Sequence, residues 1–180
     1  ADTDTLNVSD LGDTSANSGT LTAATLTGLG MTQGINYTTF ETFNLQLSNG
    51  ADTFPIQSTA ASVVTTISGN DGDDIFNVGN AGNSLDDILG VLTINGNAPS
   101  ASDVLNINDQ GDTDDNNYTL TGITLNRTGM AQLTYGTIES LFLNTGTGSD
   151  NIILSNTQAG ATTVNANVGA DTITVQMTSG

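Results

Sequence analysis

Aspartates in glycine-rich turns are the residues whose type and spacing could do chemistry. Four short segments read Gly-x-Asp-x-apolar, and their aspartates are Asp52, Asp74, Asp150 and Asp171. Glycine adopts the positive φ values of a tight turn and leaves space beside the backbone. Ca²⁺ prefers six to eight oxygen ligands, taken from carboxylates, carbonyls and water. These turns therefore offer the chemistry of a calcium site.

A second acidic turn occurs twice, as Asp10-x-Gly-Asp13 and as Asp109-x-Gly-Asp112. In another interpretation, the aspartates only build corners, because an aspartate side chain readily accepts backbone N–H bonds within a turn. Both interpretations concern the same eleven candidate calcium ligands, which are Asp10, Asp13, Asp52, Asp71, Asp73, Asp74, Asp109, Asp112, Asp114, Asp150 and Asp171.

The segment from Gly69 to Asn77 resembles the repeat of RTX (hemolysin-type) calcium-binding proteins, Gly-Gly-x-Gly-x-Asp-x-apolar-x, with Asn70 at the second glycine. The resemblance implies calcium held between the turns of successive coils, with Asp74 and its equivalents at the aspartate of the motif. It also implies a large secreted bacterial protein, located outside the cell or on its surface. The motif recurs here about once in 22 residues, whereas that family repeats it every nine.

Charge and composition exclude several classes of function. The chain has 19 acidic residues against one basic residue, no histidine and no cysteine, for a net charge of −18. Nucleic acids and anionic membrane surfaces are therefore poor partners, because both are bound through Lys and Arg. No run approaches the roughly 20 apolar residues of a membrane-spanning helix, so we expect no membrane insertion.

The same composition argues against an enzyme. Without His, Cys or Lys, most activated nucleophiles cannot be built. Paired carboxylates such as Asp73 and Asp74 could serve a polysaccharide-active enzyme, which is the least favoured alternative. The two glutamates, Glu41 and Glu139, occupy equivalent positions of the repeat described next, which indicates a structural role for both.

The elements that would position these residues are short β-strands, since Thr, Val, Ile and Leu alternate with polar residues between glycine-rich turns. Two halves of the chain are copies: Asp4–Thr14 matches Asp103–Thr113 at an offset of 99 residues. Within each copy, Asp-x-apolar positions recur every 21–29 residues or at about twice that distance. Periods of this length are typical of solenoids.

We therefore predict an all-β right-handed parallel β-solenoid with coils of 21–29 residues. One copy of a repeat of about 98 residues would span 1–99, and a second, incomplete copy would span 100–180 in the same continuous stack. The apolar residues predicted to face its interior are Leu6, Val8, Leu21, Leu26, Phe43, Leu45, Phe54, Ile56, Val64, Ile67, Phe76, Val78, Leu92, Ile94, Leu105, Ile107, Leu120, Leu125, Leu141, Leu143, Ile152, Leu154, Val164, Ile173 and Val175.

Arg127 is the one basic side chain. Its guanidinium either bridges aspartates of neighbouring coils or lies solvated on the surface, and we expect the surface position. Its counterpart in the first copy is Gly28, which could form no such bridge.

The expected function is structural: a stiff extracellular rod, stabilised by calcium at its corners, or a protomer that associates end to end into a filament. The alternative is an adhesin or passenger module that binds a surface. An exposed aromatic patch would favour that alternative, and Tyr37, Tyr118 and Tyr135 offer little material for one.

Overall fold

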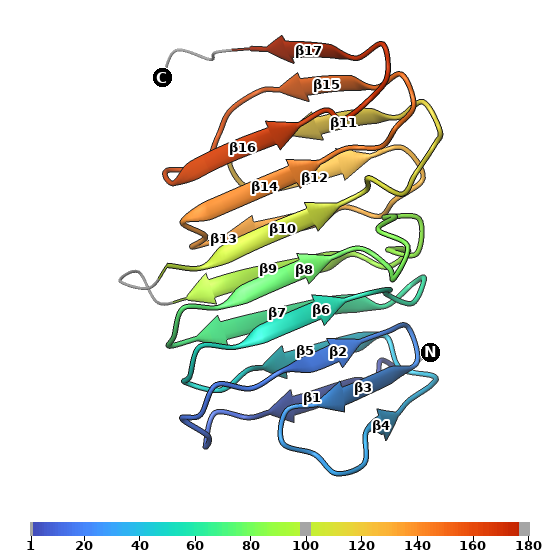
Figure 1. The fold of residues 1–180 in the computed structure, drawn as a ribbon. Coiled ribbons are helices and arrows are strands. Elements are labelled where there is room, and N and C mark those ends of the chain that lie inside the picture. Colours follow the sequence, from blue (N-terminus) through green and yellow to red (C-terminus); the bar gives the residue numbers. More distant parts are fainter. Residues whose placement is uncertain (1, 98–101, 177–180) are drawn as a thin grey trace.

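A computed structural model describes residues 2–97 and 102–176 (Figure 1). Their fold is all-β, as predicted, with seventeen strands in two sheets and no helix within these ranges. The first sheet has nine strands in the order β1 (Thr5–Ser9), β5 (Thr42–Gln46), β7 (Val64–Asn70), β9 (Leu92–Asn97), β13 (Leu133–Gly136), β12 (Thr124–Arg127), β11 (Asn117–Leu120), β15 (Asn151–Leu154) and β17 (Thr172–Val175). The second sheet has eight, in the order β16 (Ala161–Asn165), β14 (Ser140–Asn144), β10 (Val104–Asn108), β8 (Ile75–Val78), β6 (Thr53–Ile56), β2 (Gly19–Leu21), β3 (Thr25–Gly28) and β4 (Ile35–Asn36).

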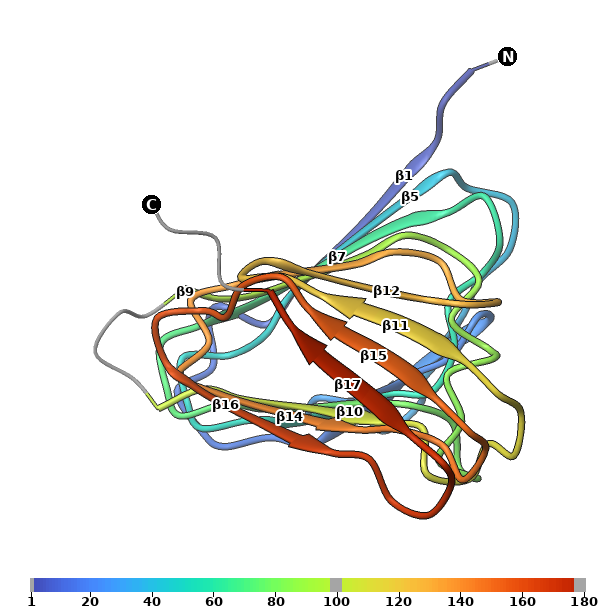
Figure 2. The ribbon, with the colours of Figure 1, turned by 90° about the horizontal axis from the view of Figure 1, so that it is seen from above.

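The chain alternates between the two sheets, so that strands adjacent in one sheet are usually separated by a passage through the other. β6 pairs with β8 in the second sheet, while the intervening β7 pairs with β5 and β9 in the first. These pairs are parallel, and Figure 2 shows the two sheets facing each other across the interior. Most strand pairs are therefore parallel, in agreement with the prediction at this level of detail.

Two antiparallel excursions depart from the uniform parallel stack that the sequence predicts. β2, β3 and β4 are antiparallel neighbours, and so are β11, β12 and β13. Threonine side chains close the tight turns between the first two strands of each set. Thr22 Oγ1 accepts the N–H of Thr25 at 2.9 Å, and Thr121 Oγ1 accepts that of Thr124 at 2.9 Å. The chain reverses there because a side-chain hydroxyl satisfies the turn.

The interior between the sheets is largely apolar. Most of the predicted core residues are buried, including Phe54, Phe76 and Leu105, each 0% exposed. Val64 is wrongly predicted: it is 47% exposed, and Thr65 takes the inward position because β7 turns its odd-numbered residues to the core. Further buried apolar residues, missing from the prediction, are Leu29, Leu47, Leu85, Ile88, Tyr118, Leu133, Tyr135 and Ile138.

Core residues near the two ends of the stack are less buried than predicted. Ile173 and Val175 of β17 are 49% and 58% exposed, since β17 is the last strand of its sheet. Leu6 and Val8 of β1, at the opposite edge, are half-buried. The boundary between the predicted copies, 1–99 and 100–180, falls outside the described residues, and the division into copies stays a prediction. None of the described segments is a helix able to cross a membrane.

Candidate functional site: carboxylates at the starts of strands

Carboxylates just before several strands reach the neighbouring strand. Asp74 precedes β8, and its Oδ1 accepts the backbone N–H of Asp52, which precedes β6, at 2.8 Å. Asp103 precedes β10 and accepts the N–H of Asp74 at 2.8 Å. Glu139 Oε2 accepts the N–H of Asp103 at 2.8 Å, and Asp52 Oδ1 accepts the N–H of Asn17 at 2.7 Å. These five residues form a continuous hydrogen-bonded row along the second sheet.

The first sheet repeats the arrangement near both of its ends. Glu41 Oε2 accepts the N–H of Asp4 at 2.8 Å, and Asp171 Oδ1 accepts the N–H of Asp150 at 2.9 Å. Asp150 Oδ1 in turn accepts the N–H of Asn116 at 2.9 Å. We call the carboxylates that accept such a bond the carboxylate ladder: Glu41, Asp52, Asp74, Asp103, Glu139, Asp150 and Asp171.

The ladder completes the hydrogen bonding of the parallel sheets. The C=O of Asp52 accepts the N–H of Ile75 at 2.8 Å, and the C=O of Asp74 accepts that of Val104 at 2.8 Å. The N–H of each of these aspartates points to the same neighbouring strand as its C=O. The neighbouring chain is still in a turn at that point, so a carboxylate oxygen accepts the N–H in place of a backbone carbonyl. A buried N–H without a partner costs roughly 1–3 kcal/mol, so each ladder bond stabilises the stacking of two strands.

Two glycines make room for the second oxygens of ladder carboxylates. A Cβ on Gly69 would overlap Oδ2 of Asp74 and lie 2.9 Å from the carbonyl oxygen of Gly96. A Cβ on Gly96 would overlap both Oδ2 of Asp103 and the carbonyl oxygen of Thr137. The interior can therefore hold these carboxylates only because the facing strand positions carry no side chain.

The second oxygens of three ladder aspartates are buried without a hydrogen-bond partner among the described residues: Oδ2 of Asp74, of Asp103 and of Asp150. Burial raises the pKa of Asp74 from 3.8 to about 7; the N–H of Asp52 opposes this shift, and the charge of Asp103 adds to it. Burial likewise raises the pKa of Asp103 to about 6. In both groups burial shifts the equilibrium towards the protonated form.

The ladder aspartates fit a corner role better than that of calcium ligands. Both oxygens of Asp52 are satisfied by the protein, since Ser48 donates its N–H and its hydroxyl to Oδ2 at 2.9 Å. Successive turns also touch directly: a Cβ on Gly72, whose φ is +119°, would lie 2.5 Å from the carbonyl oxygen of Gly50. This backbone contact leaves little room for an ion between these two turns.

The remaining candidate ligands are dispersed. Asp71, Asp73 and Asp114 are exposed. Asp73 accepts the N–H of Ser102 at 2.9 Å, and Asp13 accepts that of Ser15 at 2.8 Å in an Asx-type turn. Across residues 2–97 and 102–176, no three acidic side chains gather into a group able to hold a metal ion. Calcium binding stays a prediction.

Arg127 corrects the prediction of a solvated surface arginine. Its side chain is 2% exposed, its Nε donates to Oδ2 of Asp109 at 2.8 Å, and its Nη1 donates to Asp86 at 2.5 Å. Its Nη2 pairs with Asp112. The hydroxyl of Tyr118 also donates to Asp109, at 2.5 Å. Arg127 faces inward because it ends β12 at a buried position of the alternation.

In the first half of the chain, the equivalent acidic turn is held by Asn17 without an arginine, whereas in the second half Asn116 makes the corresponding contact to Asp112 at 3.2 Å beside Arg127. The Nδ2 of Asn17 donates to Oδ2 of Asp13 at 3.0 Å and lies 3.5 Å from Oδ2 of Asp10. Burial raises the pKa of Asp10, and the charges of Asp13 and Asp52 add to the shift. An asparagine amide therefore contacts the acidic turn in both halves, and a cation is added only in the second.

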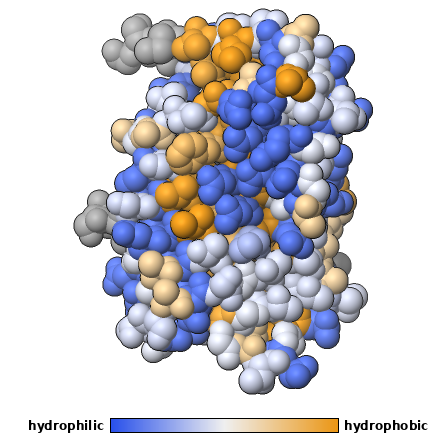
Figure 3. All heavy atoms as spheres, viewed as in Figure 1, coloured by the Kyte–Doolittle hydropathy of each residue, from blue (hydrophilic) through white to orange (hydrophobic). Residues whose placement is uncertain are grey.

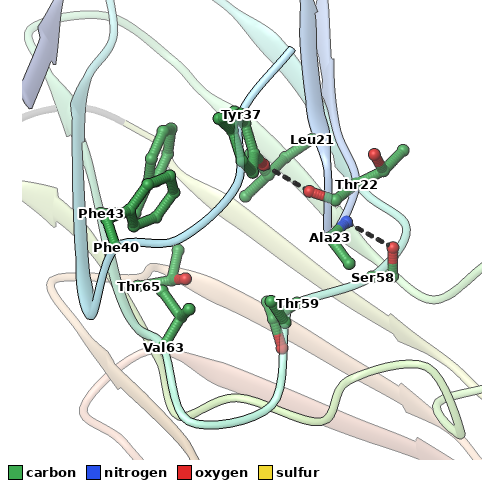
Figure 4. Close-up of a pocket in the computed structure, with 11 residues that line it drawn as sticks. Leu21, Thr22, Ala23, Tyr37, Phe40, Phe43, Ser58, Thr59, Val63 and Thr65 are labelled. Atoms are coloured by element: carbon green, nitrogen blue, oxygen red, sulfur yellow. Dashed lines mark hydrogen bonds between the residues drawn. The ribbon is translucent and has the colours of Figure 1, made fainter. Parts of the chain in front are cut away.

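An aromatic cluster packs one end of the stack rather than offering a binding platform (Figure 4). The rings of Tyr37, Phe40 and Phe43 have centroids 5.1–6.0 Å apart, and the hydroxyl of Tyr37 donates to the carbonyl oxygen of Thr22. The cavity beside them measures about 10 Å³, the size of one water molecule. The other two tyrosines, at 118 and 135, are buried as well.

Comparisons with family models, with curated proteins and with solved structures find no match to this chain. The contacts described above therefore carry the functional interpretation. Of the ladder, the sequence indicated the motif aspartates and a structural role for Glu41 and Glu139. It did not indicate that the carboxylates of these glutamates accept the backbone N–H groups of Asp4 and Asp103. The signal was present, since each stands directly before an alternating run.

Proposed function

We propose that this chain is a structural, non-enzymatic segment of an extracellular or cell-surface bacterial protein, folded as a right-handed parallel β-solenoid that acts as a stiff rod. The observation that carries this proposal is the carboxylate ladder. Its members form hydrogen bonds between successive strands, along the direction in which such a rod extends. Carboxylates bonded in this way stabilise the stacking of strands and are not available to bind a substrate.

Rigidity follows from the same contacts. The described strands are joined by continuous parallel pairing, from β5 through β7 to β9 in one sheet and from β6 through β8 to β10 in the other. Asparagine side chains add a second set of bonds outside the core, such as Asn106 to Asn77 at 2.9 Å and Asn44 to Asn7 at 2.8 Å. Bending the stack would break several of these bonds at once.

Calcium enters the proposal only through the exposed aspartates, because the ladder aspartates already bind the backbone. We expect the chain to fold without the ion, and we expect calcium to raise the thermal midpoint only by occupying outer turns such as the one with Asp71 and Asp73. The resemblance to RTX repeats would then be one of turn architecture, with glycine and aspartate forming corners.

The experiment is far-UV circular dichroism with small-angle X-ray scattering, on protein treated with chelator and again in millimolar calcium. A β-spectrum and an elongated particle in chelator support a rod built by its own hydrogen bonds. A chain that is unfolded in chelator and folds only with calcium would overturn the corner role of the aspartates. A compact, nearly spherical particle under both conditions would overturn the rod.

A further inference from the structure

A carboxylate just before a strand that has a neighbour below it, towards β1 in Figure 1, occurs only where that neighbour is parallel, although some strands with a parallel neighbour below lack one. Every carboxylate of the ladder has a parallel strand below it and accepts the N–H of a residue just before that lower strand. Asn17 and Asn116 precede β2 and β11, whose lower neighbours are antiparallel. These amides bind instead to Asp13 at 3.0 Å and to Asp112 at 3.2 Å. A carboxylate at this position therefore indicates a parallel strand below.

Asp4 has such a carboxylate at the lower end of the first sheet. It precedes β1, the lowest strand of that sheet, and its own N–H and C=O both bond upwards, to Glu41 and Thr42. Among the described residues, nothing donates to its carboxylate. Its sequence counterpart, Asp103, accepts the N–H of Asp74. The Asp4 carboxylate can therefore accept an N–H from a further strand, which the described residues do not supply.

The upper end of the same sheet presents the complementary donor. The N–H groups of Thr172 and Gln176 bond down to β15, so the N–H and C=O groups of the alternate residues Asp171, Ile173 and Val175 point away from the stack. Within the described part of the chain, no acceptor reaches the N–H of Asp171. By the same alternation, Thr5, Asn7 and Ser9 of β1 point their backbone groups downwards. The upper edge strand β17 and the lower edge strand β1 therefore each present three residues whose backbone N–H and C=O groups point outwards.

We propose that the upper edge of the first sheet docks in parallel onto the lower edge of a second copy of this chain, with β17 pairing with β1 of that copy. The N–H of Asp171 then donates to the carboxylate of Asp4, and the C=O of Asp171 accepts the N–H of Thr5. This contact rests on the proposed rod and names its partner. It is head-to-tail, so repetition of the same contact gives a filament.

The register follows from a junction already present in the structure. β8 and β10 pair as Phe76 with Leu105 and Val78 with Ile107, while the carboxylate of Asp103 holds the N–H before β8. β17 and β1 are the sequence counterparts of these two strands. The same register pairs Ile173 with Leu6 and Val175 with Val8, four apolar residues of the end strands that are incompletely buried.

Apolar side chains gather at the upper end of the face shown in Figure 3, whereas much of its middle is polar. Ile173 and Val175 of β17 are 49% and 58% exposed, and docking would bury both over the core of the next copy. The proposal concerns the first sheet alone. In the second sheet the end strands are β16 and β4, the sequence counterparts of β7 and β13, and in the first sheet an additional strand, β9, lies between β7 and β13. The counterpart of β9 is not part of the described chain.

Two variants block opposite edges. Asn7→Pro removes a downward N–H from β1 without removing a bond within the sheet, and Asn7→Ala controls for the lost amide contact to Asn44. Val175→Lys places a charge on the upper edge. Val64→Lys is its control, because Val64 is 47% exposed on the side of the stack. Sedimentation velocity is run at high ionic strength, since chains of net charge −18 repel one another.

The wild-type chain and both control variants should form assemblies that grow with concentration, whereas each blocked variant should remain monomeric. An equimolar mixture of the blocked variants should give a dimer and nothing larger, because one free upper edge meets one free lower edge. Wild-type protein that stays monomeric, or blocked variants that assemble like it, would overturn the docking. Circular dichroism of the same samples separates the two proposals: a folded monomer refutes only the docking, and an unfolded chain refutes the rod.

Discussion

The buried carboxyl of Asp74 predicts an unusual dependence of stability on pH. Its Oδ1 holds the N–H of Asp52, while its Oδ2 is buried beside Gly69 without a partner. Burial raises its pKa from 3.8 to about 7, so the folded chain holds a proton that the unfolded chain has released. The contribution of a group with a raised pKa is fully present below the unfolded value and is lost as pH rises through the folded value. Stability should therefore fall between about pH 4 and pH 7.

The size of the effect follows from the shift. A rise from 3.8 to about 7 corresponds to about 4 kcal/mol of unfolding free energy, lost across this window. Asp74→Asn keeps an oxygen for the N–H of Asp52 and places an uncharged amide nitrogen at the position of Oδ2. The variant should match wild type within about 1 kcal/mol at pH 4 and should be more stable by about 3–4 kcal/mol at pH 8.

The assay is urea denaturation followed by circular dichroism at half-unit pH steps from 4 to 8, in chelator. Asp71→Asn is the control: Asp71 is exposed, so this variant removes one negative charge without touching the interior. It should follow the wild-type curve to within about 0.5 kcal/mol. If Asp74→Asn also follows the wild-type curve, or is less stable at pH 8, the buried oxygen has a partner or is charged at little cost, and the reasoning is refuted.

Three further predictions use the same denaturation assay. Gly96→Ala should destabilise by about 2–4 kcal/mol, because its Cβ would overlap a ladder carboxylate, whereas Gly12→Ala has open space and should change little; equal effects would contradict the glycine's role. Arg127→Met should cost about 3–5 kcal/mol by leaving buried carboxylates unpaired, and adding Asp109→Asn should restore part of it; a neutral Arg127→Met would show the cluster to be solvated. Thr121→Val should cost about 1 kcal/mol by opening the β11–β12 turn, and no loss would mean that the backbone alone closes it.

The sequence predicted the sheet residues well because a period of two is imposed by the pleat. Phe54 and Ile56, or Leu105 and Ile107, are separated by one outward residue and are buried as expected. The prediction failed at Val64, where two valines precede a run of threonines and the period alone does not fix which residues face inward. The core then selected Thr65, at 3% exposed, in the layer of Ile67.

The antiparallel excursions and the position of Arg127 were missed for different reasons. The excursions depend on local threonine turns, such as Thr22 with Thr25, and the alternation of apolar and polar residues is the same in parallel and antiparallel strands. The position of Arg127 depends on contacts between segments far apart in the sequence. Arg127 is buried because the turn with Asp109 and Asp112 lies over the end of β12, and because Asp86 comes from another loop. In the sequence, a single arginine among 19 acidic residues is equally consistent with a solvated side chain.

The two glutamates show that the length of a ladder side chain depends on the backbone hydrogen bonding of the turn that carries it. At aspartate corners, one amide of the upper strand bonds to the carbonyl below, as Ile75 does to Asp52. At the glutamate corners, two amides share that carbonyl: the N–H groups of Glu139 and Ser140 lie 3.1 and 3.0 Å from the C=O of Asp103. Glu41 and Thr42 share the C=O of Asp4 in the same way, at 3.1 and 3.2 Å. The residue before the strand is displaced by this sharing, and one additional methylene lets its carboxylate still reach the N–H below. Glutamate therefore occurs where the turn itself differs, and aspartate where it does not.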